Sequence, residues 1–380
     1  MDLPLAARTK RMESSLIREL LKLASRPGMI SLAGGVPAPE AFPMPELKAA
    51  SQAALEKHGP RALQYSPTEG HPVLRAFVAE KLGVDPDWVL ITSGSQQGID
   101  LVARVFLDEG DAVVVEAPTY MGGLLAMRPF GPTFVPVPLA ADGPELDALP
   151  PGAKLAYFLP NFQNPTGALW SEEKREAALA WAEDVGAYVL EDDPYGHIYF
   201  EAPPPPPLFA RAPERVIYAG TFSKLIAPGL RIGYVVARPE VLEHLIKAKQ
   251  AADLHTNILG QAILAELVET GALEPQAERV RALYRRRRDI MAEALAAQMP
   301  DFVRWEVPRG GMFFWLRLPE GLDTRALLEK ALEAGVAFVP GEAFFAGEAY
   351  PAARLTFASV DEAAIQTGVE RLAGVLEAAS

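Results

Sequence analysis

Short apolar runs alternate with helical stretches through the middle of the chain. Six runs have the length and the β-branched and aromatic content of buried strands: residues 88–92 (WVLIT), 112–116 (AVVVE), 154–159 (KLAYFL), 187–190 (AYVL), 216–220 (VIYAG) and 232–237 (IGYVVA). After the first run, a polar turn leads into a predicted helix that ends near Asp108. Apolar strands that alternate with helices are typical of a mostly parallel sheet covered on both faces. The pattern therefore predicts an α/β fold.

The C-terminal part has a different pattern. It becomes helical from about Pro239, with a long amphipathic helix around residues 276–299. Further strands are expected at residues 304–307, 312–318, 336–339 and 354–358, around a helix at 324–334 and before a terminal helix. This order predicts a second, smaller α+β domain. We place the large domain at residues 46–295 and the small domain at residues 1–45 plus 296–380. The first twenty residues predict a short arm and an amphipathic helix.

Composition narrows the chemistry. The 380 residues are 49% hydrophobic and 22% charged, which is typical of a globular protein. The absence of cysteine excludes thiol nucleophiles, cysteine-ligated zinc and iron–sulfur clusters. A net charge of −13 argues against a duplex-binding surface, although a local cationic pocket stays open. Four successive arginines at residues 285–288 point in four directions on a helix, so they predict a solvated, partly ion-paired helix.

Several common site types lack their motifs. The five histidines are scattered singly, without metal-ligand spacing, so we expect no metal. The chain has no G-x-S-x-G elbow, no G-x-G-x-x-G after a strand and no P-loop, which disfavours a hydrolase, a dinucleotide dehydrogenase or an NTPase. The longest charge-free run, residues 155–171, is broken by prolines and amides, and the N-terminus has no apolar signal region. We therefore expect a cytoplasmic protein without a membrane or nucleic-acid partner.

Polar clusters follow five of the predicted strands, at residues 93–97 (SGSQQ), 117–120 (APTY), 161–167 (NFQNPTG), 191–195 (EDDPY) and 221–231 (TFSKLIAPGLR). Each alone has an ordinary explanation: a turn, a core tyrosine, a loop, a solvated acidic turn or a surface lysine. In open α/β sheets, however, ligands gather at the carboxyl ends of the strands. Together the clusters supply a lysine, a carboxylate, phosphate donors, an aromatic ring and hydrogen-bond donors. Those are the parts that a pyridoxal phosphate site needs.

These strings also occur in a familiar order. They run from SLAGGVPAPEAFP through LQYSPTEG, SGSQQ, EAPTY, PNFQNPTG, EDDPY and TFSKLIAPGLRIG to PRGGMFFW and RLTFA. Over essentially its whole length the chain resembles the fold-type-I pyridoxal-phosphate-dependent aminotransferases of class I/II. It is most similar to the branch that contains 2-aminoadipate and kynurenine aminotransferases.

The resemblance implies a fold, a cofactor and a reaction. The fold is the fold-type-I transferase fold, with a large domain on a mostly parallel, seven-stranded-type sheet and a smaller α+β domain. The cofactor is pyridoxal 5′-phosphate. The reaction is a ping-pong transfer of an amino group between an amino acid and 2-oxoglutarate, the amino acid being 2-aminoadipate or glutamate, with leucine and aromatic amino acids as further candidates.

The resemblance also assigns residues around the cofactor ring. Lys224 forms the covalent link to the cofactor and later moves the proton of the substrate Cα. Asp192 pairs with the pyridine nitrogen, while Asn164 and Tyr195 hydrogen-bond the ring oxygen. Tyr120 stacks on the ring face. Of these, Lys224, Asp192 and Tyr120 are the expected catalytic residues.

The cofactor phosphate has its own expected contacts. The resemblance gives it the backbone amides of Ser95 and Gln96, the side chain of Arg231, and a hydroxyl from Ser223 or Thr221. The choice between the two hydroxyls stays open, because members of the family often carry Ser-x-Ser-Lys where this chain has Thr-Phe-Ser-Lys at residues 221–224.

The remaining expected contacts involve the substrate and a second subunit. Arg354 clamps the α-carboxylate of the substrate, braced by Asn164 and lined by Gly35. Tyr65 reaches the phosphate of the neighbouring subunit, so a homodimer is expected. His71 stands where the family usually has a tyrosine or a similar residue, which could alter the substrate entrance.

The predicted N-terminal helix carries a hypothesis about specificity. Ser15 and Arg18 are three residues apart and so project from one helix face. In the 2-aminoadipate branch the corresponding helix covers the active-site entrance. We therefore expect Arg18 to pair with a distal substrate carboxylate, with solvent exposure as its ordinary alternative.

Two other functions compete with transamination. The same fold and cofactor serve decarboxylases and β-lyases, because the cofactor stabilises several carbanions. The fold also serves as a non-catalytic sensing module of transcription regulators, which need a DNA-binding domain ahead of it. The first motif begins at Ser31 and the net charge is −13, so we expect an enzyme, an aminotransferase, that acts on small amino acids and 2-oxo acids.

Overall fold

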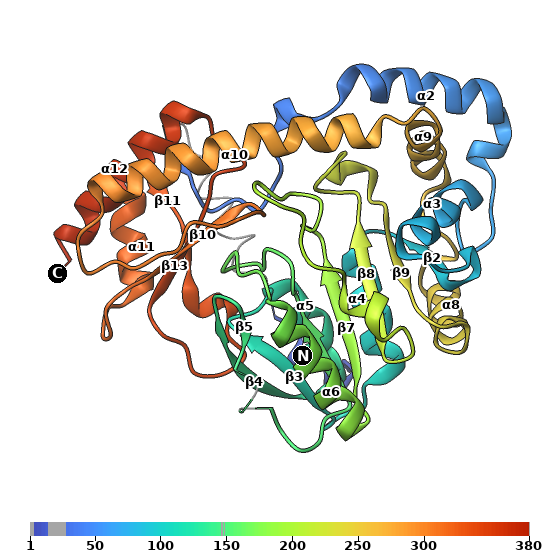
Figure 1. Cartoon of the computed structure of the whole chain (residues 1–380), viewed down its shortest axis with the longest axis horizontal. Helices are drawn as coiled ribbons and strands as arrows, with labels where there is room; N and C mark the ends of the chain where they lie inside the picture. Colours follow the sequence, from blue (N-terminus) through green and yellow to red (C-terminus); the bar gives the residue numbers. More distant parts are fainter. Residues whose placement is uncertain (1–3, 14–27, 146, 148, 380) are drawn as a thin grey trace.

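A computed structural model of the chain describes residues 4–13, 28–145, 147 and 149–379. Its main feature is an eight-stranded sheet with the strand order β2-β9-β8-β7-β6-β3-β4-β5 (Figure 1). The strands are β2 (Val89–Thr92), β3 (Ala112–Ala117), β4 (Thr133–Ala140), β5 (Gly143–Pro144), β6 (Leu155–Phe158), β7 (Tyr188–Asp193), β8 (Val216–Thr221) and β9 (Gly233–Val236).

Most of this sheet is parallel, as predicted. Strands β4, β3, β6, β7 and β8 pair in parallel, whereas β9 is antiparallel to both of its neighbours, β8 and β2. Strand β2 therefore points the same way as the parallel strands. The eighth strand, β5, is a two-residue antiparallel addition to the end of β4. An α/β fold on a seven-stranded-type sheet is thus confirmed.

Alternate residues of each strand face two separate apolar cores. In β3, Val113 and Val115 face the core shared with α4 (Ser95–Phe106), α5 (Met121–Met127) and α8 (Pro239–Asp253). Val114 faces the opposite core, which includes side chains of α6 (Glu172–Val185) and α7 (Leu208–Arg211). Helix α3 (Pro72–Leu82) packs against β2, α9 (Ile258–Glu269) packs against α3, and α2 (Met44–His58) packs against α9. Burial of both faces explains why these strands are apolar throughout.

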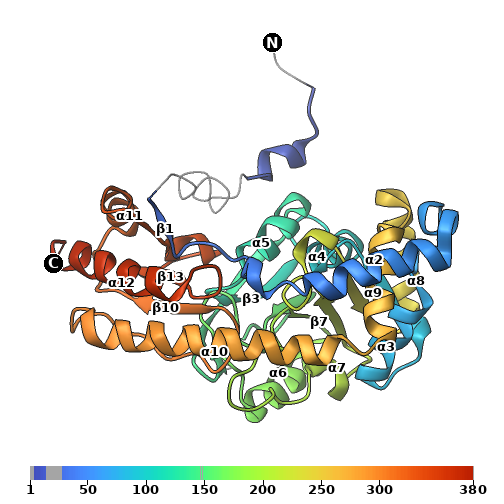
Figure 2. The same ribbon diagram turned by 90° about the horizontal axis from the view of Figure 1, so that it is seen from above.

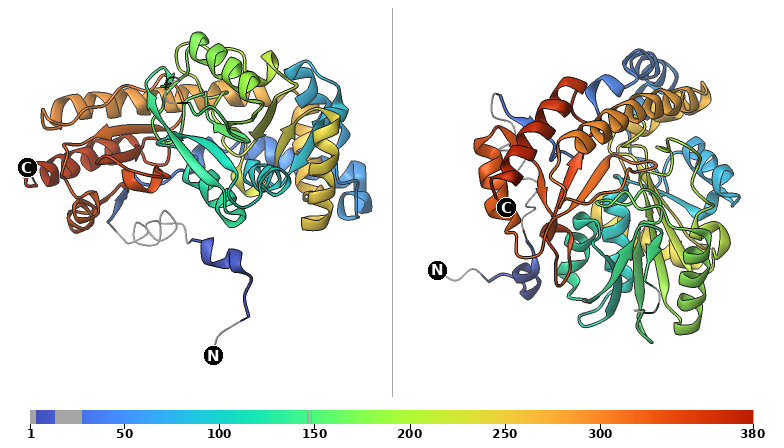
Figure 3. Two further views of the ribbon diagram at one scale, coloured as in Figure 1. Left: turned by 90° about the horizontal axis from the view of Figure 1, so that it is seen from below. Right: turned by 60° about the vertical axis from the view of Figure 1, so that its left-hand side comes forward.

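The C-terminal part forms a smaller sheet with the strand order β10-β13-β12, made of β10 (Phe313–Arg317), β13 (Ala352–Thr356) and β12 (Val339–Pro340). Helices α11 (Thr324–Glu333) and α12 (Glu362–Glu377) lie beside it (Figure 3). Strand β1 (Ile30–Ser31) returns from the N-terminal part and pairs in parallel with β11 (Val336–Ala337). The strand predicted at residues 304–307 is wrong, because only a single bridge joins Arg304 to Arg317 and Pro308 then ends the segment.

Helix α10 (Leu273–Gln298) runs along both sheets (Figure 1). The proposed domain boundary at residue 295 falls inside this helix, so the helix continues across it. The division into residues 46–295 and residues 1–45 plus 296–380 stays a proposal.

The arginine run on α10 is less exposed than predicted. Arg287 donates to the Ala358 carbonyl at 2.6 Å and pairs with Glu40. Arg288 donates to the Pro308 carbonyl at 2.7 Å and pairs with Glu201 at 2.8 Å. The expectation of ion pairing holds, but a fully solvated helix is wrong, because neighbouring segments cover α10 at these two residues.

The short 3₁₀ helices are η1 (Ala7–Arg11), η2 (Pro39–Ala41), η3 (Gly59–Leu63), η4 (Pro86–Trp88), η5 (Arg128–Phe130), η7 (Pro228–Leu230) and η8 (Gly341–Phe344). Helix η1 lies outside the main layers, held by ion pairs of Arg11 with Glu109 and of Glu13 with Arg128 (Figure 2). The predicted N-terminal helix with Ser15 and Arg18 lies outside the described residues. Within the described ranges, no helix is both long and apolar enough to span a bilayer.

Candidate active site

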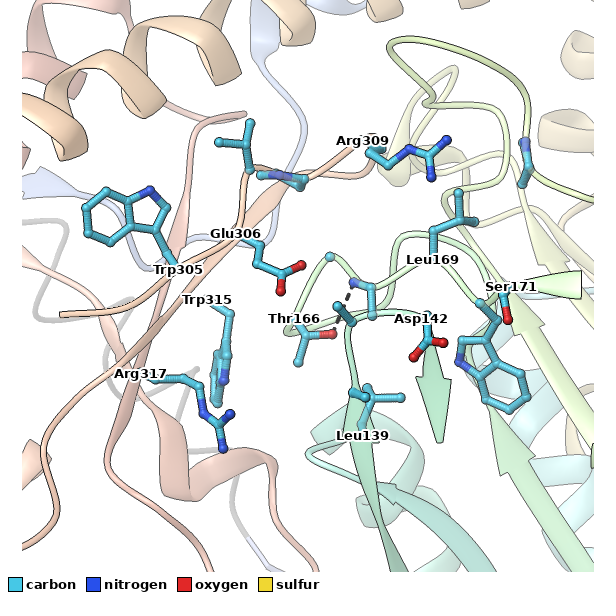
Figure 4. A pocket seen from close by; sticks show the side chains of 18 of the residues that line it. Leu139, Asp142, Thr166, Leu169, Ser171, Trp305, Glu306, Arg309, Trp315 and Arg317 are labelled. Carbon is cyan, nitrogen blue, oxygen red and sulfur yellow. Dashed lines mark hydrogen bonds between the residues drawn. The ribbon is translucent and has the colours of Figure 1, made fainter. Parts of the chain in front are cut away.

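Two cavities in the described part of the chain differ in what lines them. The larger cavity has a volume of about 980 Å³ (Figure 4). Its lining includes Leu139, Asp142 and Leu169 and, from the C-terminal part, Trp305 and Arg309. None of the predicted site residues lines it.

The smaller cavity, of about 390 Å³, lies at the carboxyl ends of the main-sheet strands. It is lined by nearly the whole predicted set: Gly35, Ser95, Gln96, Tyr120, Asn164, Asp192, Tyr195, Thr221, Ser223, Lys224, Arg231 and Arg354. Tyr65 lies elsewhere, and Ser15 and Arg18 lie outside the described residues. The structure therefore brings the predicted ring, phosphate and α-carboxylate residues into one cavity, which we take as the candidate active site.

Sheet topology explains this convergence. Strands β2, β3, β6, β7 and β8 point the same way, so the segments that follow them meet at one edge. Strand β9 is antiparallel, and its beginning therefore lies at that same edge. Arg231, two residues before β9, adopts a left-handed conformation (φ 57°) and reaches the cavity from there.

Asp192 is a buried carboxylate with one oxygen unused. The Tyr157 hydroxyl donates to Oδ2 at 2.7 Å, whereas Oδ1 has no hydrogen-bond partner in the described part of the chain. Burial raises the pKa of Asp192 to about 7, against the opposing effect of the Tyr157 hydrogen bond. The next residue, Asp193, accepts from the Tyr218 hydroxyl and the Gly196 amide, both at 2.8 Å, and does not line the cavity. Strand alternation thus assigns the cavity to Asp192.

Lys224 has an environment suited to a nucleophile. Its Nζ donates to the Gly35 carbonyl at 2.9 Å. Burial and the positive charges of Arg354 and Arg231 lower the pKa of Lys224 to about 8, while Asp192 opposes the shift. A lysine amine with a lowered pKa has a larger unprotonated, reactive fraction near neutral pH.

The side chain of Gln96, for which the sequence predicted only a backbone contact, holds Tyr120 in place. Its hydroxyl donates to Gln96 Oε1 at 3.2 Å, and Gln96 Nε2 donates to the Gly122 carbonyl at 2.7 Å. A Cβ atom on Gly122 would lie 2.4 Å from the Tyr120 ring, so a side chain there would displace the ring. Burial raises the pKa of Tyr120 to about 12, which keeps its hydroxyl protonated. Tyr157 was also missed, because in the sequence it reads as one more apolar strand residue.

The turn after β2 forms a cradle of backbone N–H groups. Gly94 (φ 80°) precedes the first turn of α4, and the Arg231 guanidinium donates to the Ser93 carbonyl at 3.2 Å. A Cβ atom on Gly94 would lie 2.7 Å from Arg231 Nη2, so glycine lets the arginine approach. A helix N-terminus with an adjacent arginine is suited to bind phosphate.

Arg354 is a buried cation without an acidic partner among the described residues. Its Nη1 donates to Asn164 Oδ1 at 2.9 Å and its Nη2 to the Ala33 carbonyl at 2.8 Å. The guanidinium carbon lies 4.2 Å from the Phe313 ring centroid. Burial lowers the pKa of Arg354 to about 10. In the described ranges no carboxylate forms an ion pair with it, so an anionic ligand would supply the missing counter-charge.

A second buried carboxylate supports the loop that carries Asn164. Glu116 accepts hydrogen bonds from Trp170 Nε1 and Gln163 Nε2, both at 3.0 Å. Gln163 Oε1 in turn accepts from the Thr166 backbone amide at 3.0 Å. Burial raises the pKa of Glu116 to about 8. These contacts explain why so many amide side chains occur in the segment 161–167.

Tyr65 and His71 lie at another surface. The Tyr65 side chain is 78% exposed, and its ring centroid is 5.8 Å from that of His255. His71 donates its backbone N–H to Gln261 Oε1 at 2.7 Å and lines a hollow with Tyr65, not the candidate active site. Among the residues with assigned positions, no cluster of three or more potential metal ligands occurs.

The chain is similar to known proteins over almost its whole length. The family model "Aminotransferase class I and II" matches residues 27–372. The chain is 49% identical to a 2-aminoadipate transaminase of Thermus thermophilus, over 97% of this chain and 95% of that protein.

Two solved structures are also similar. One is an alpha-aminoadipate aminotransferase from Thermus thermophilus, complexed with N-(5′-phosphopyridoxyl)-L-leucine (47% identity, TM-score 0.93, covering 98% and 97% of the two chains). The other is a kynurenine aminotransferase from Pyrococcus horikoshii (40% identity, TM-score 0.95, covering 99% and 97%).

Proposed function

We propose a specific reaction for this chain, which belongs to the class I and II aminotransferases and uses pyridoxal 5′-phosphate. The chain moves an amino group by a ping-pong reaction between an amino acid, 2-aminoadipate or glutamate, and 2-oxoglutarate. One observation carries this proposal. Lys224, the half-bonded carboxylate of Asp192 and the unpaired guanidinium of Arg354 line the same cavity. Lys224 matches the aldehyde of the cofactor, Asp192 matches its protonated ring nitrogen, and Arg354 matches the α-carboxylate of the substrate.

The residues present fit the cofactor. Asp192 Oδ1 lacks a hydrogen bond that a protonated pyridine nitrogen would provide. A cation at that position would also favour the charged carboxylate over the neutral form that burial favours. When bound, pyridoxal phosphate supplies the electron sink that stabilises negative charge at the substrate Cα. Tyr120 would cover the ring face, and Asn164 and Tyr195 would bind the ring oxygen.

The protein groups then have distinct tasks. Lys224 Nζ would hold the cofactor covalently and, as a free amine, would be the general base that accepts the proton of the substrate Cα. Asp192 holds a proton on the ring nitrogen through its negative charge. Arg354 binds the substrate α-carboxylate with Asn164 beside it, and Gly35 lines the cavity next to them.

For the phosphate we propose the backbone amides of Ser95 and Gln96, the Arg231 guanidinium and the Ser223 hydroxyl. The choice of Ser223 over Thr221 rests on the hydrogen bonds at this turn. The Thr221 hydroxyl donates to Ser223 Oγ at 2.9 Å. Its oxygen also accepts a hydrogen bond from the Ser223 backbone N–H at 3.1 Å. The Thr221 hydroxyl is thus engaged, and it also lies 3.3 Å from the Ile232 carbonyl, whereas the Ser223 hydroxyl donates to no acceptor in the described part of the chain.

We further propose a cytoplasmic homodimer in which Tyr65 contacts the phosphate of the other subunit. The exposed ring of Tyr65, together with exposed Leu63 and Leu254, supports this arrangement, because large apolar side chains are seldom left in water without a partner.

Replacing Arg354 by lysine is expected to lower kcat/KM for every amino acid tested by about ten- to a hundredfold, because the charge remains but the bidentate contact is lost. Steady-state kinetics with 2-aminoadipate and with leucine, each with 2-oxoglutarate as acceptor, will measure the effect. Arg317→Lys, an exposed arginine on β10 that stacks on Tyr350, is the matched control and should change neither value. A loss confined to 2-aminoadipate would assign Arg354 to the side chain of the substrate instead.

Arg18 is proposed to bind the distal carboxylate of 2-aminoadipate, glutamate or 2-oxoglutarate, with Ser15 as a further substrate contact. Arg18→Gln should then raise KM for 2-aminoadipate and 2-oxoglutarate by about ten- to a hundredfold and spare leucine and phenylalanine. The control is Arg8→Gln, an exposed residue of η1. Equal losses for acidic and apolar substrates, or none for either, would contradict this role.

A substrate panel tests the overall function. Purified enzyme is incubated with single amino acids and 2-oxoglutarate, and glutamate formation is followed. We expect turnover with 2-aminoadipate, and parallel double-reciprocal plots as the sign of a ping-pong order. Glutamate formation from no amino acid would overturn the choice of acceptor, and turnover confined to non-acidic donors would overturn the choice of 2-aminoadipate.

A further inference from the structure

A buried ion pair lies behind the phosphate cradle. Lys249 and Asp253 are one turn apart at the end of α8, and Lys249 Nζ lies 2.8 and 3.0 Å from the two carboxylate oxygens of Asp253. The Lys249 side chain is fully buried and that of Asp253 is 29% exposed. Burying a lysine charge is costly unless it is paired and fully hydrogen-bonded, so the arrangement around the pair is informative.

The pair is hydrogen-bonded to both ends of the cradle, at Ser93 and Gln97. Asp253 Oδ2 accepts from Ser93 Oγ at 3.0 Å and from Gln97 Nε2 at 2.7 Å. Lys249 Nζ donates to Gln97 Oε1 at 2.8 Å, and the same oxygen accepts the Ser93 backbone N–H, also at 2.8 Å. The two charged residues thus close a network around the first and last residues of the segment 93–97.

The residues between those two ends are the ones that face the cavity. Gly94, Ser95 and Gln96 line it, whereas neither Lys249 nor Asp253 does. Glycine at position 94 makes the turn intrinsically adaptable, since its left-handed conformation is one of many open to it. A cradle that binds through backbone N–H groups therefore needs its ends fixed from outside.

The pKa values of both members of the pair respond to this network. Burial alone would raise the pKa of Asp253, but the hydrogen bonds from Lys249, Gln97 and Ser93 lower it overall. Burial lowers the pKa of Lys249, while its contacts with Asp253 oppose that shift.

We propose that Lys249 and Asp253 are positioning residues for the cofactor phosphate, which act through Ser93 and Gln97 to hold the N–H groups of the cradle toward it. The inference rests on the proposed phosphate contacts of Ser95, Gln96 and Arg231. It adds two residues that touch neither cofactor nor substrate and that set how well the phosphate, as distinct from the ring, is bound.

The test compares two ion pairs on the same helix. The double variant Lys249→Met with Asp253→Asn removes the buried pair without leaving one charge alone. The control, Lys247→Met with Glu243→Gln, removes an exposed pair at the same spacing on α8 (Nζ to Oε1 2.5 Å). Each full-length enzyme is first freed of bound cofactor and then dialysed to equilibrium against a concentration series of pyridoxal phosphate and, in parallel, of pyridoxal, and the bound fraction is read from the cofactor absorbance.

We expect the Kd for pyridoxal phosphate to rise about ten- to a hundredfold in the Lys249/Asp253 variant, with the Kd for pyridoxal and both control values unchanged. An unchanged Kd for pyridoxal phosphate, or equal losses for both ligands, would overturn the positioning role. If that variant does not fold, Ser93→Ala decides, because it breaks one link to Asp253 and should give a smaller loss, again confined to the phosphorylated ligand.

A third variant separates this inference from the function on which it rests. Arg231→Gln should weaken binding of pyridoxal phosphate strongly if the phosphate lies where we propose. Loss in Arg231→Gln without loss in the Lys249/Asp253 variant would reject only the positioning role. No loss in Arg231→Gln would reject the proposed placement of the phosphate itself.

Discussion

Replacing Lys224 by alanine should lower transamination by about four orders of magnitude or more, because one residue supplies both the covalent link and the general base. No other lysine lines the cavity, so a second amine cannot take over within the described structure. Steady-state rates with 2-aminoadipate and 2-oxoglutarate measure the loss. Lys247→Ala, an exposed lysine on α8, should leave the rate unchanged.

The position of the covalent link can be checked independently of activity. Borohydride reduction of the wild-type enzyme, followed by peptide mapping, should find the pyridoxyl group on Lys224. A pyridoxyl group on another lysine, or a Lys224→Ala variant that retains turnover, would reject the assignment.

Replacing Asp192 by asparagine should leave the cofactor bound but slow proton abstraction from the substrate Cα by about three orders of magnitude. The substitution removes the negative charge that keeps the ring nitrogen protonated, while its size and its contact with Tyr157 can be kept. The measurement is the rate with substrate deuterated at Cα. A larger primary isotope effect than in the wild type should appear as this step becomes rate-limiting.

Asp193→Asn is the matched control, since the adjacent carboxylate bonds Tyr218 and Gly196 away from the cavity. It should lower thermal stability more than activity. A reversed outcome, with Asp193→Asn slow and Asp192→Asn unaffected, would move the ring-nitrogen contact to Asp193.

The fold could be predicted where the chain repeats a simple pattern. Apolar runs between helical stretches located six strands of the main sheet, because both faces of those strands are buried. Strand β4 was not predicted, because its sequence, TFVPVPLA, contains two prolines. Only its last two residues pair with β5, so over residues 133–138 it has β3 as its sole partner and the open side of an edge strand, which tolerates residues without an N–H.

The candidate site divides in the same way. Residues that end a strand and carry a functional group, such as Asp192, Lys224 and Asn164, stand out in a sequence. Tyr157 and Lys249 do not, because their importance depends on contacts across 35 and 152 residues with Asp192 and Gln97. Arg18 could be singled out only by resemblance and spacing, and it lies outside the described residues.

The antiparallel pairing of β8 with β9 has a consequence for the evolution of this site. Lys224 and Arg231 lie on one hairpin connection, whose two ends are locked in register by the pairing of Thr221 with Gly233. With these residues in their proposed roles, the aldehyde end and the phosphate end of the cofactor are both held by a single loop. The length of this loop therefore sets the distance between the two contacts, and so the length of the cofactor that fits, independently of changes in the C-terminal sheet. Substrate preference can therefore diverge through residues that contact the substrate side chain, while this loop, and with it the choice of cofactor, stays the same.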